Sequence, residues 1–300
     1  MNFKYFLGVL ALATLSFTIS CSSEEENVDA SGTFEAREVI VSSEANGRII
    51  NLNLQEGKEL IDGEIYGLID TVQLSLKKRQ LQASIDVAAT KYQDVSLQTD
   101  ALKERIKTAN KEVKRVKNLI SAGAANKKQL DDLNASLLVM KKELAATEYA
   151  LNSVNKSIDA EINAMKVQLE QIDDQLVRSK IVSPISGIVL AQYAQEGELT
   201  GAGKPLFKVA DLGNMFLRAY VISYQLTEIK VGQQVTVYAD MGQDDSRTYE
   251  GTISWISDKA EFTPKTVQTK DERANLVYAV KIAFKNDGYA KIGMYGDIKF

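Results

Sequence analysis

The sequence predicts an α+β protein of several modules, in which a long antiparallel coiled-coil hairpin interrupts one β unit and a small β-barrel follows. Three observations carry this prediction. Apolar residues recur at helical spacing through residues 71–179, a region with a single glycine, Gly123. Two glycine-punctuated segments flank that region and align with each other, and residues 212–300 alternate as β-strands do.

Residues 1–20 have the features of a secretory signal peptide: a lysine near the start, an apolar run and small residues before Cys21. Cys21 is the only cysteine, so an intrachain disulfide is excluded. Its position resembles the processing site of bacterial lipoproteins, which implies lipidation of Cys21, although Thr18 stands where that pattern prefers leucine. An incidental thiol is the alternative. Residues 21–31 are expected to be a lipid anchor with an acidic linker.

The composition excludes several classes of function. The chain has no histidine, 25% charged residues and a formal net charge of −4. His-dependent catalytic triads and typical zinc sites are therefore excluded. A nucleic-acid partner is not expected, because a nucleic-acid binder usually shows a basic face. We find no catalytic constellation, and we expect neither enzyme activity nor a bound cofactor or metal.

Residues 71–179 are predicted to form a coiled-coil helical hairpin. Apolar residues follow steps of three and four over residues 74–120 and again over residues 130–176. The two seams are equally long and lie evenly about Gly123, which is expected at the tip with the positive φ of a helix C-cap. Asn126 would cap the returning helix. Arms of about 50 residues give a rod of roughly 75 Å.

The sequence predicts one continuous helix in each arm, because neither arm contains proline or a further glycine. Tyr92 takes a seam position in the first arm, and Thr99 is one of its polar exceptions. The second seam has a four-plus-four step over residues 154–162, which is a stutter. Pairing of both helices with other chains is the alternative to a hairpin.

The segments that flank the hairpin, residues 47–70 and 187–211, share the spacing of their glycines and a Glu-Gly pair. They resemble the two halves of a biotinyl/lipoyl barrel-sandwich domain, and residues 180–211 are taken as the whole second half. Each half is too small to bury a core alone, so the halves are expected to meet at the root of the rod. Asp70 is followed by threonine and not by the lysine of a swinging-arm carrier, so no attached cofactor is expected.

Residues 32–46 are predicted to be a strand that leads into this lipoyl-like region. Residues 212–300 read as five or six strands with turns rich in Gly, Asn and Asp, which suggests a small closed or half-closed barrel. The segment "KAEFTPKTVQTKDERAN" is the one long polar insertion in it and is expected to be an exposed loop.

Together these modules resemble the periplasmic adaptor, or membrane fusion protein, family of the hemolysin-secretion D type. The resemblance rests on the split half-motifs, on "KIVSPISGIV" (180–189), on "VISYQLTEIKVGQQVTVYAD" (221–240) and on "AEFTPKTVQTKDER" (260–273). The last segment is similar to short adaptors of ATP-driven exporters. The order half-lipoyl, hairpin, half-lipoyl, barrel is the most specific feature.

The resemblance implies an adaptor that forms a homo-oligomeric ring in the periplasm, anchored by lipid to the inner or the outer membrane. It would link an inner-membrane exporter, of the ABC type or a proton-driven pump, to an outer-membrane tunnel channel. The family's tip motif falls on Arg115, Leu119 and Asn126, where asparagine replaces the usual serine. The rival hypothesis is a structural or surface envelope lipoprotein whose coiled coil binds without a transporter.

Overall fold

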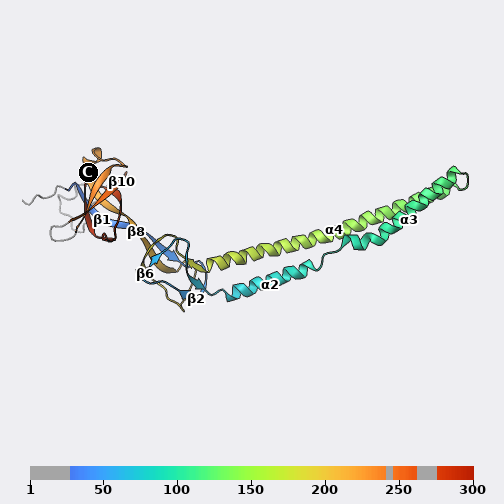
Figure 1. The fold of residues 1–300 in the computed structure, drawn as a ribbon, viewed down its shortest axis with the longest axis horizontal. Coiled ribbons are helices and arrows are strands. Elements are labelled where there is room, and N and C mark those ends of the chain that lie inside the picture. The colour runs from blue at the N-terminus through green and yellow to red at the C-terminus, as the bar shows by residue number, and fades with distance from the viewer. Residues whose placement is uncertain (1–27, 241–245, 262–275) are drawn as a thin grey trace, which may run out of the picture.

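The computed structural model describes residues 28–240, 246–261 and 276–300, and in these residues a β-rich end continues into a long helical rod (Figure 1). A barrel lies at one end, a barrel-sandwich lies in the middle, and the rod projects away from both. The rod consists of α2 (Val72–Ala89), α3 (Val95–Ser121) and α4 (Lys127–Arg178). No helix in the described ranges combines the length and the apolar character that a membrane crossing needs.

The predicted barrel is confirmed, and six antiparallel strands close it. It is not made by residues 212–300 alone, because the N-terminal strand of residues 30–42 is one of the six. Their order is β1-β12-β9-β10-β11-β8, and β8 pairs back with β1. The elements are β1 (Ala30–Ser42), β8 (Pro205–Ile222), the short 3-10 helix η1 (Gln225–Thr227), β9 (Gln234–Asp240), β10 (Ser246–Ile256), β11 (Val277–Lys285) and β12 (Tyr295–Lys299). Inward-facing residues such as Phe34, Leu217 and Ile282 fill the interior.

The barrel-sandwich is built from both repeat halves, as predicted. The first half supplies β2 (Gly47–Leu52), β3 (Glu59–Leu60) and β4 (Ile65–Ile69), and the second half supplies β5 (Lys180–Val182), β6 (Gly187–Gln192), β7 (Leu199–Thr200) and the start of β8. Ile49 and Leu60 of the first half share one core with Ile181 and Phe207 of the second. Neither half could bury these side chains alone.

The two halves pair reciprocally, and equivalent residues lie 140 positions apart in the sequence. β2 pairs with β7, with Gly47 opposite Thr200, and β3 pairs with β6, with Leu60 opposite Gly187. Each half therefore pairs its six-residue strand with the two-residue strand of the other half. The hairpin is inserted between two pieces, each of which completes the strand pairing of the other.

The turn glycines of the Glu-Gly pairs continue this exchange. The Gly57 N–H donates to the Val189 carbonyl at 2.9 Å, and the equivalent Gly197 N–H donates to the Ile49 carbonyl at 2.8 Å. Both glycines have positive φ, 83° and 87°, a region that residues with a Cβ rarely adopt. Glycine is therefore required at both turns, where its N–H donates to the long strand of the other half.

Two buried serines make a second reciprocal contact. Ser43 and Ser183 are 3% and 0% exposed, and each hydroxyl donates at 2.7 Å to the carbonyl two residues further on. Their own carbonyls accept N–H bonds from turn glycines of the opposite half, Ser43 from Gly203 at 2.8 Å and Ser183 from Gly63 at 2.9 Å. The repeat as read from the sequence began after these serines and missed them.

β1 and β8 run through both β domains, so the barrel and the barrel-sandwich are joined by a two-stranded ribbon (Figure 1). The boundary predicted between residues 211 and 212 lies inside β8, at an irregularity in its pairing with β1. There the Asp211 carboxylate accepts the N–H groups of Gly213 and Asn214, both at 3.1 Å. Asn286 donates to the Leu212 carbonyl at 2.9 Å, which ties the irregularity to the barrel.

Ser183→Ala should lower the free energy of unfolding by about 1 kcal/mol, because the partly buried hydrogen bond from its hydroxyl to the Ile185 carbonyl is lost. Urea denaturation checks this value. Ser84→Ala, at an exposed position of α2, is the matched control and should change stability by less than about 0.5 kcal/mol. Equal effects of the two changes would show that the buried turn does not hold the halves together.

Thr200 takes the position equivalent to Leu60, and its buried hydroxyl oxygen has no hydrogen-bond partner within the described residues. Thr200→Val keeps the shape of the side chain and removes the desolvated hydroxyl. We expect it to raise the free energy of unfolding by about 1 kcal/mol, measured by the same denaturation. A loss of stability would mean that this hydroxyl is hydrogen-bonded in the folded protein.

Candidate functional site

The far end of the rod is the turn between α3 and α4, and Gly123 lies in it as predicted. Gly123 has a φ of 73°, and its N–H donates to the Ile120 carbonyl at 3.0 Å. The Ala124 N–H donates to the Leu119 carbonyl at 2.8 Å. These two bonds form a Schellman motif, which satisfies the last carbonyls of α3 and reverses the chain.

Asn126 fixes the start of the returning helix. Its backbone is extended, with φ −96° and ψ 140°, and its Oδ1 accepts the Lys128 N–H at 3.0 Å. This is the N-cap expected from the sequence. The oxygen is therefore used for capping, and the Nδ2 group makes no hydrogen bond within the described part of the chain. The turn is held at both of its ends.

Arg115 and Leu119 lie one helical turn apart on α3, close to this turn. The Arg115 side chain is 66% exposed and Leu119 is 37% exposed. Glu112 holds the guanidinium in a bidentate pair, in which Arg115 Nε donates to Oε2 at 2.9 Å and Nη2 contacts Oε1. The hydrogen bonds from Arg115 lower the pKa of the Glu112 carboxyl. The structure thus presents an oriented cation beside an exposed leucine, with Asn126 across the turn.

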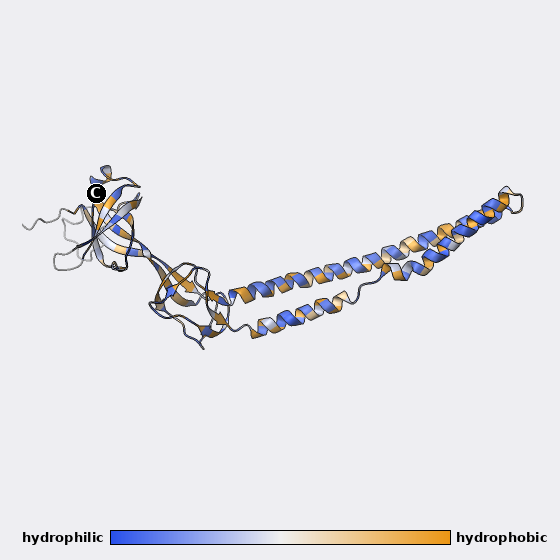
Figure 2. Cartoon of the chain, in the orientation of Figure 1, coloured by the Kyte–Doolittle hydropathy of each residue, from blue (hydrophilic) through white to orange (hydrophobic). Residues whose placement is uncertain are grey.

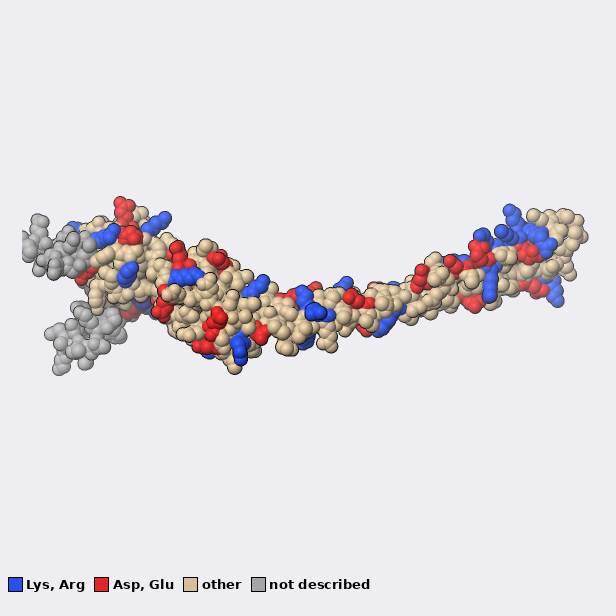
Figure 3. Space-filling view, turned by 60° about the horizontal axis from the view of Figure 1, so that its bottom comes forward, with Lys and Arg blue, Asp and Glu red and all other residues tan. Residues whose placement is uncertain are grey.

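Unpaired cations gather at the same end of the rod. Lys and Arg side chains are concentrated near the tip on the face in Figure 3. Near the tip, the exposed lysines that make no ion pair within the described residues are Lys111, Lys114 and Lys117 of α3 and Lys127 and Lys128 of α4. Asp131 and Asp132 follow on α4. Since the whole chain has a net charge of −4, the tip is a basic surface on an acidic protein.

The first arm of the rod is two helices, and the prediction of one continuous helix was wrong. α2 ends at Ala89 and α3 begins at Val95. Tyr92, predicted in the seam, is 43% exposed in the segment between them. Asp94 starts α3 as its N-cap and accepts the Leu97 N–H at 3.0 Å. A capping aspartate thus restarts the helix without any glycine or proline.

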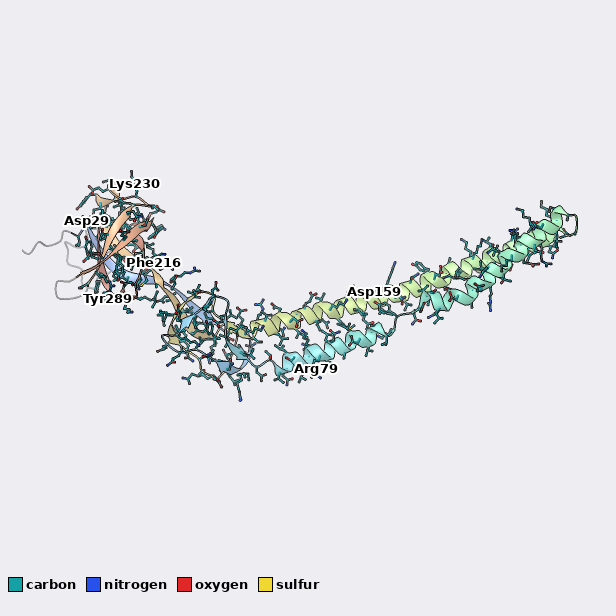
Figure 4. The ribbon with its side chains drawn as sticks, in the orientation of Figure 1. Asp29, Arg79, Asp159, Phe216, Lys230 and Tyr289 are labelled. Carbon is teal, nitrogen blue, oxygen red and sulfur yellow. The ribbon has the colours of Figure 1, made fainter. Side chains whose placement is uncertain are left out.

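Side chains of α4 replace the backbone hydrogen bonds that this break removes. Asn155 binds the Gln93 backbone on both sides: Oδ1 accepts its N–H at 2.8 Å, and Nδ2 donates to its carbonyl at 2.9 Å. The Tyr92 hydroxyl donates to Asp159, which lies on α4 beside the break (Figure 4). This hydrogen bond raises the pKa of the Tyr92 hydroxyl. The break is therefore fixed to α4 by side-chain hydrogen bonds, and we call it the fastened break.

The break faces the stutter of the α4 seam. On the side near the β domains, α2 and α4 share a small core made by Ile85, Ala88, Ile158 and Ile162. At the tip-side end of the stutter, Val154 is 47% exposed. α2 packs against the part of α4 nearer the base and α3 packs against the part nearer the tip (Figure 1). The break in the first arm thus lies opposite the point where the apolar seam of α4 changes its spacing.

Asn155→Ala should release the break, because the Gln93 N–H and carbonyl lose their partner. We expect the Gln93 amide to exchange with deuterium at least about tenfold faster, from the loss of a hydrogen bond of about 1.4 kcal/mol. Asn152→Ala, at an exposed position one turn earlier on α4, is the control and should leave the exchange unchanged. Unchanged exchange in Asn155→Ala would contradict a fastened break.

The remaining segments named in the sequence analysis lie outside the described residues. Cys21 and most of the segment 260–273 lie outside the described ranges. Within those ranges, no three Asp, Glu, His or Cys side chains gather as they would around a metal ion. The hydropathy along the rod alternates in short stretches from base to tip (Figure 2).

A helical rod inserted into a split barrel-sandwich, with a small barrel beyond, defines the adaptor class of membrane fusion proteins (MFPs). The family model described as "RND MFP, barrel-sandwich hybrid domain" matches residues 37–212, more than half of the chain. The chain belongs to this family. Its fold is that of the structural adaptors of efflux and secretion systems.

Two relatives are similar over most of their length. The chain is 25% identical over 278 residues to the "UPF0194 membrane protein in asrC 5'region" of Acidithiobacillus ferridurans, which covers 86% of this chain and 82% of the relative. It is also 25% identical over 300 aligned residues to the UPF0194 membrane protein YbhG of Salmonella arizonae, with 93% and 90% covered.

Solved structures share the fold at lower identity. MacA from Actinobacillus actinomycetemcomitans superimposes with a TM-score of 0.56 at 21% identity, over 90% of this chain and 76% of MacA. The membrane fusion protein Spr0693 from Streptococcus pneumoniae R6 superimposes with a TM-score of 0.53 at 18% identity, over 90% of this chain and 96% of Spr0693.

Proposed function

We propose that the chain is the adaptor subunit of a tripartite export or efflux system, which links an inner-membrane exporter to an outer-membrane channel through the hairpin tip. The observation that carries this proposal is the two-ended shape of the molecule (Figure 1). α4 has 52 residues and spans roughly 78 Å, so it separates the capped tip from the β domains by that length. Such a molecule is suited to bridging two partners.

The proposal places the β domains at the exporter and the chain in the periplasm. A lipid on Cys21 would anchor the chain to the cell envelope, with the inner membrane favoured over the outer. Several copies would form a ring around the export path. The segment 260–273 favours an ABC-type exporter, and the RND family model supports a proton-driven pump as the alternative.

The mechanism is mechanical. Changes in the exporter would move the barrel and the barrel-sandwich, and the rod would pass this movement to the channel. The continuity of α4 supports this role, since a single helix of 52 residues runs from the second half-repeat to the tip turn. The fastened break in the first arm supports it as well, because Asn155 limits bending where α2 and α3 separate.

Arg115, Leu119 and Asn126 are the proposed channel contacts. Glu112 orients the guanidinium of Arg115, Leu119 supplies exposed apolar surface, and the Nδ2 group of Asn126 is left as a donor by the cap. The unpaired lysines around them favour an acidic partner surface, because complementary charge speeds encounter and selects the partner. Gly123 shapes the turn and makes no contact in this proposal.

Arg115→Asp should abolish photo-crosslinking of the channel from a benzophenone amino acid at Asn118 and lower export at least about tenfold, since it sets an acid against an acidic surface. Export of a transported dye and mass spectrometry of the cross-linked product measure the two effects. Arg79→Asp is the matched control, because Arg79 is exposed on α2 far from the tip (Figure 4). Export at the parent rate in Arg115→Asp would refute the tip assignment.

A further inference from the structure

The end of the barrel farthest from the rod brings the first and last described residues of the chain together. Figure 1 marks the C-terminus there, and Figure 4 labels Asp29 and Lys230 at the same end. The loop between β8 and β9, residues 223–233, lies at this end and contains η1. We call it the β8–β9 loop.

Gln225 fastens the β8–β9 loop to the first described residues. Its side chain is 9% exposed, its Nε2 donates to the Asp29 carbonyl at 2.6 Å, and its Oε1 accepts the Ile222 N–H at 2.9 Å. The Asp29 carboxylate in turn accepts the Phe300 N–H at 2.7 Å. The loop is therefore held at the point where the N-terminal segment joins the barrel.

The same loop exposes large apolar and amphipathic side chains. Tyr224 is 66% exposed and Val231 is 63% exposed, and Lys230 beside it is exposed as well. Ile229 is only 4% exposed, because it packs into the barrel core and anchors the loop. Val28, next to Asp29, is 42% exposed. Tyrosine, lysine and aliphatic side chains together are typical of a surface that lies in a membrane interface.

The length of the N-terminal segment places this surface near lipid. Cys21 and Val28 are seven residues apart, and a chain of that length spans at most about 25 Å. An acyl anchor on Cys21 would therefore keep Val28 within that distance of the bilayer, and Gln225 ties the β8–β9 loop to Asp29 beside it. A single anchor binds a membrane marginally, and a second contact makes the attachment stable.

We propose that the β8–β9 loop rests on the membrane that holds the anchor, with Tyr224 and Val231 inserted among the lipid headgroups. The inference rests on the proposed lipidation of Cys21 for its location, and it adds a second attachment to the one made by the lipid. It also orients the barrel, because two attachments on one end direct the rod away from the bilayer.

The first test uses the lipidated full-length mature chain in vesicles of phosphatidylethanolamine and phosphatidylglycerol. Tyr224→Cys is labelled with a polarity-sensitive fluorophore, since the thiol of Cys21 is blocked in the lipidated chain. We expect brominated lipids to quench this label and to leave a label at Tyr149→Cys on the rod unquenched. Absence of quenching at position 224 overturns the proposal. If the fluorophore also labels the chain that carries no introduced cysteine, Cys21 is free and the proposed anchor is wrong. The contact of the β8–β9 loop with lipid is then decided by the second test.

The second test removes the lipid with Cys21→Ser and measures co-sedimentation with the same vesicles. Tyr224→Ser combined with Val231→Ser should weaken binding about tenfold, because the two side chains lose their burial in lipid. Tyr149→Ser combined with Val139→Ser is the matched control, since these rod residues are 78% and 65% exposed and have the same chemistry. Failure of the Cys21→Ser chain to bind, or equal binding of the two double variants, overturns the proposal.

Discussion

The structure depends on the reciprocal pairing of two chain segments that are 140 residues apart in the sequence. Each contributes one long strand and one short strand to this pairing, and the turn glycines of each donate N–H groups to carbonyls of the other. β4 and β5, which pair directly, lead into α2 and out of α4. Closure of this sheet therefore brings the two stems of the rod side by side and sets the direction in which the rod projects.

The rod needs that support because its own core is thin. One seam position holds a polar side chain, Thr99, whose buried hydroxyl donates to the Val95 carbonyl at 2.7 Å. Lys78 of α2 pairs with Asp173 of α4 at 2.5 Å, and both side chains are more than 40% exposed. Exposed ion pairs of this kind contribute little to stability. The unbroken α4 runs the length of the rod, and α2 and α3 pack on it one after the other.

The sequence was sufficient for features that depend on local chemistry. Gly123 and Asn126 could be placed because the ends of helices demand residues of their type, and the Glu-Gly turns could be matched because both halves keep the same spacing. The features that were missed depend on contacts between distant segments. Ser43 and Ser183 become informative only when the repeat is extended upstream, and the break at residues 90–94 has no glycine or proline to mark it. Asp94, a residue suited to capping a helix, and the stutter on α4 were the two signals of a break in the sequence. They indicate a break only together, and the sequence does not show that they face each other.

The course of β1 has a consequence for how the molecule bears load. This strand begins beside Asp29 and pairs with β8 along its whole length, through the barrel and into the barrel-sandwich. Tension applied to the N-terminal segment would pull β1 along its own axis, perpendicular to its hydrogen bonds with β8, so that many of them would have to shear at once. A strand loaded in this way resists extraction far better than one peeled from an edge, bond after bond. The two β domains would therefore remain folded under a pull on the N-terminal segment.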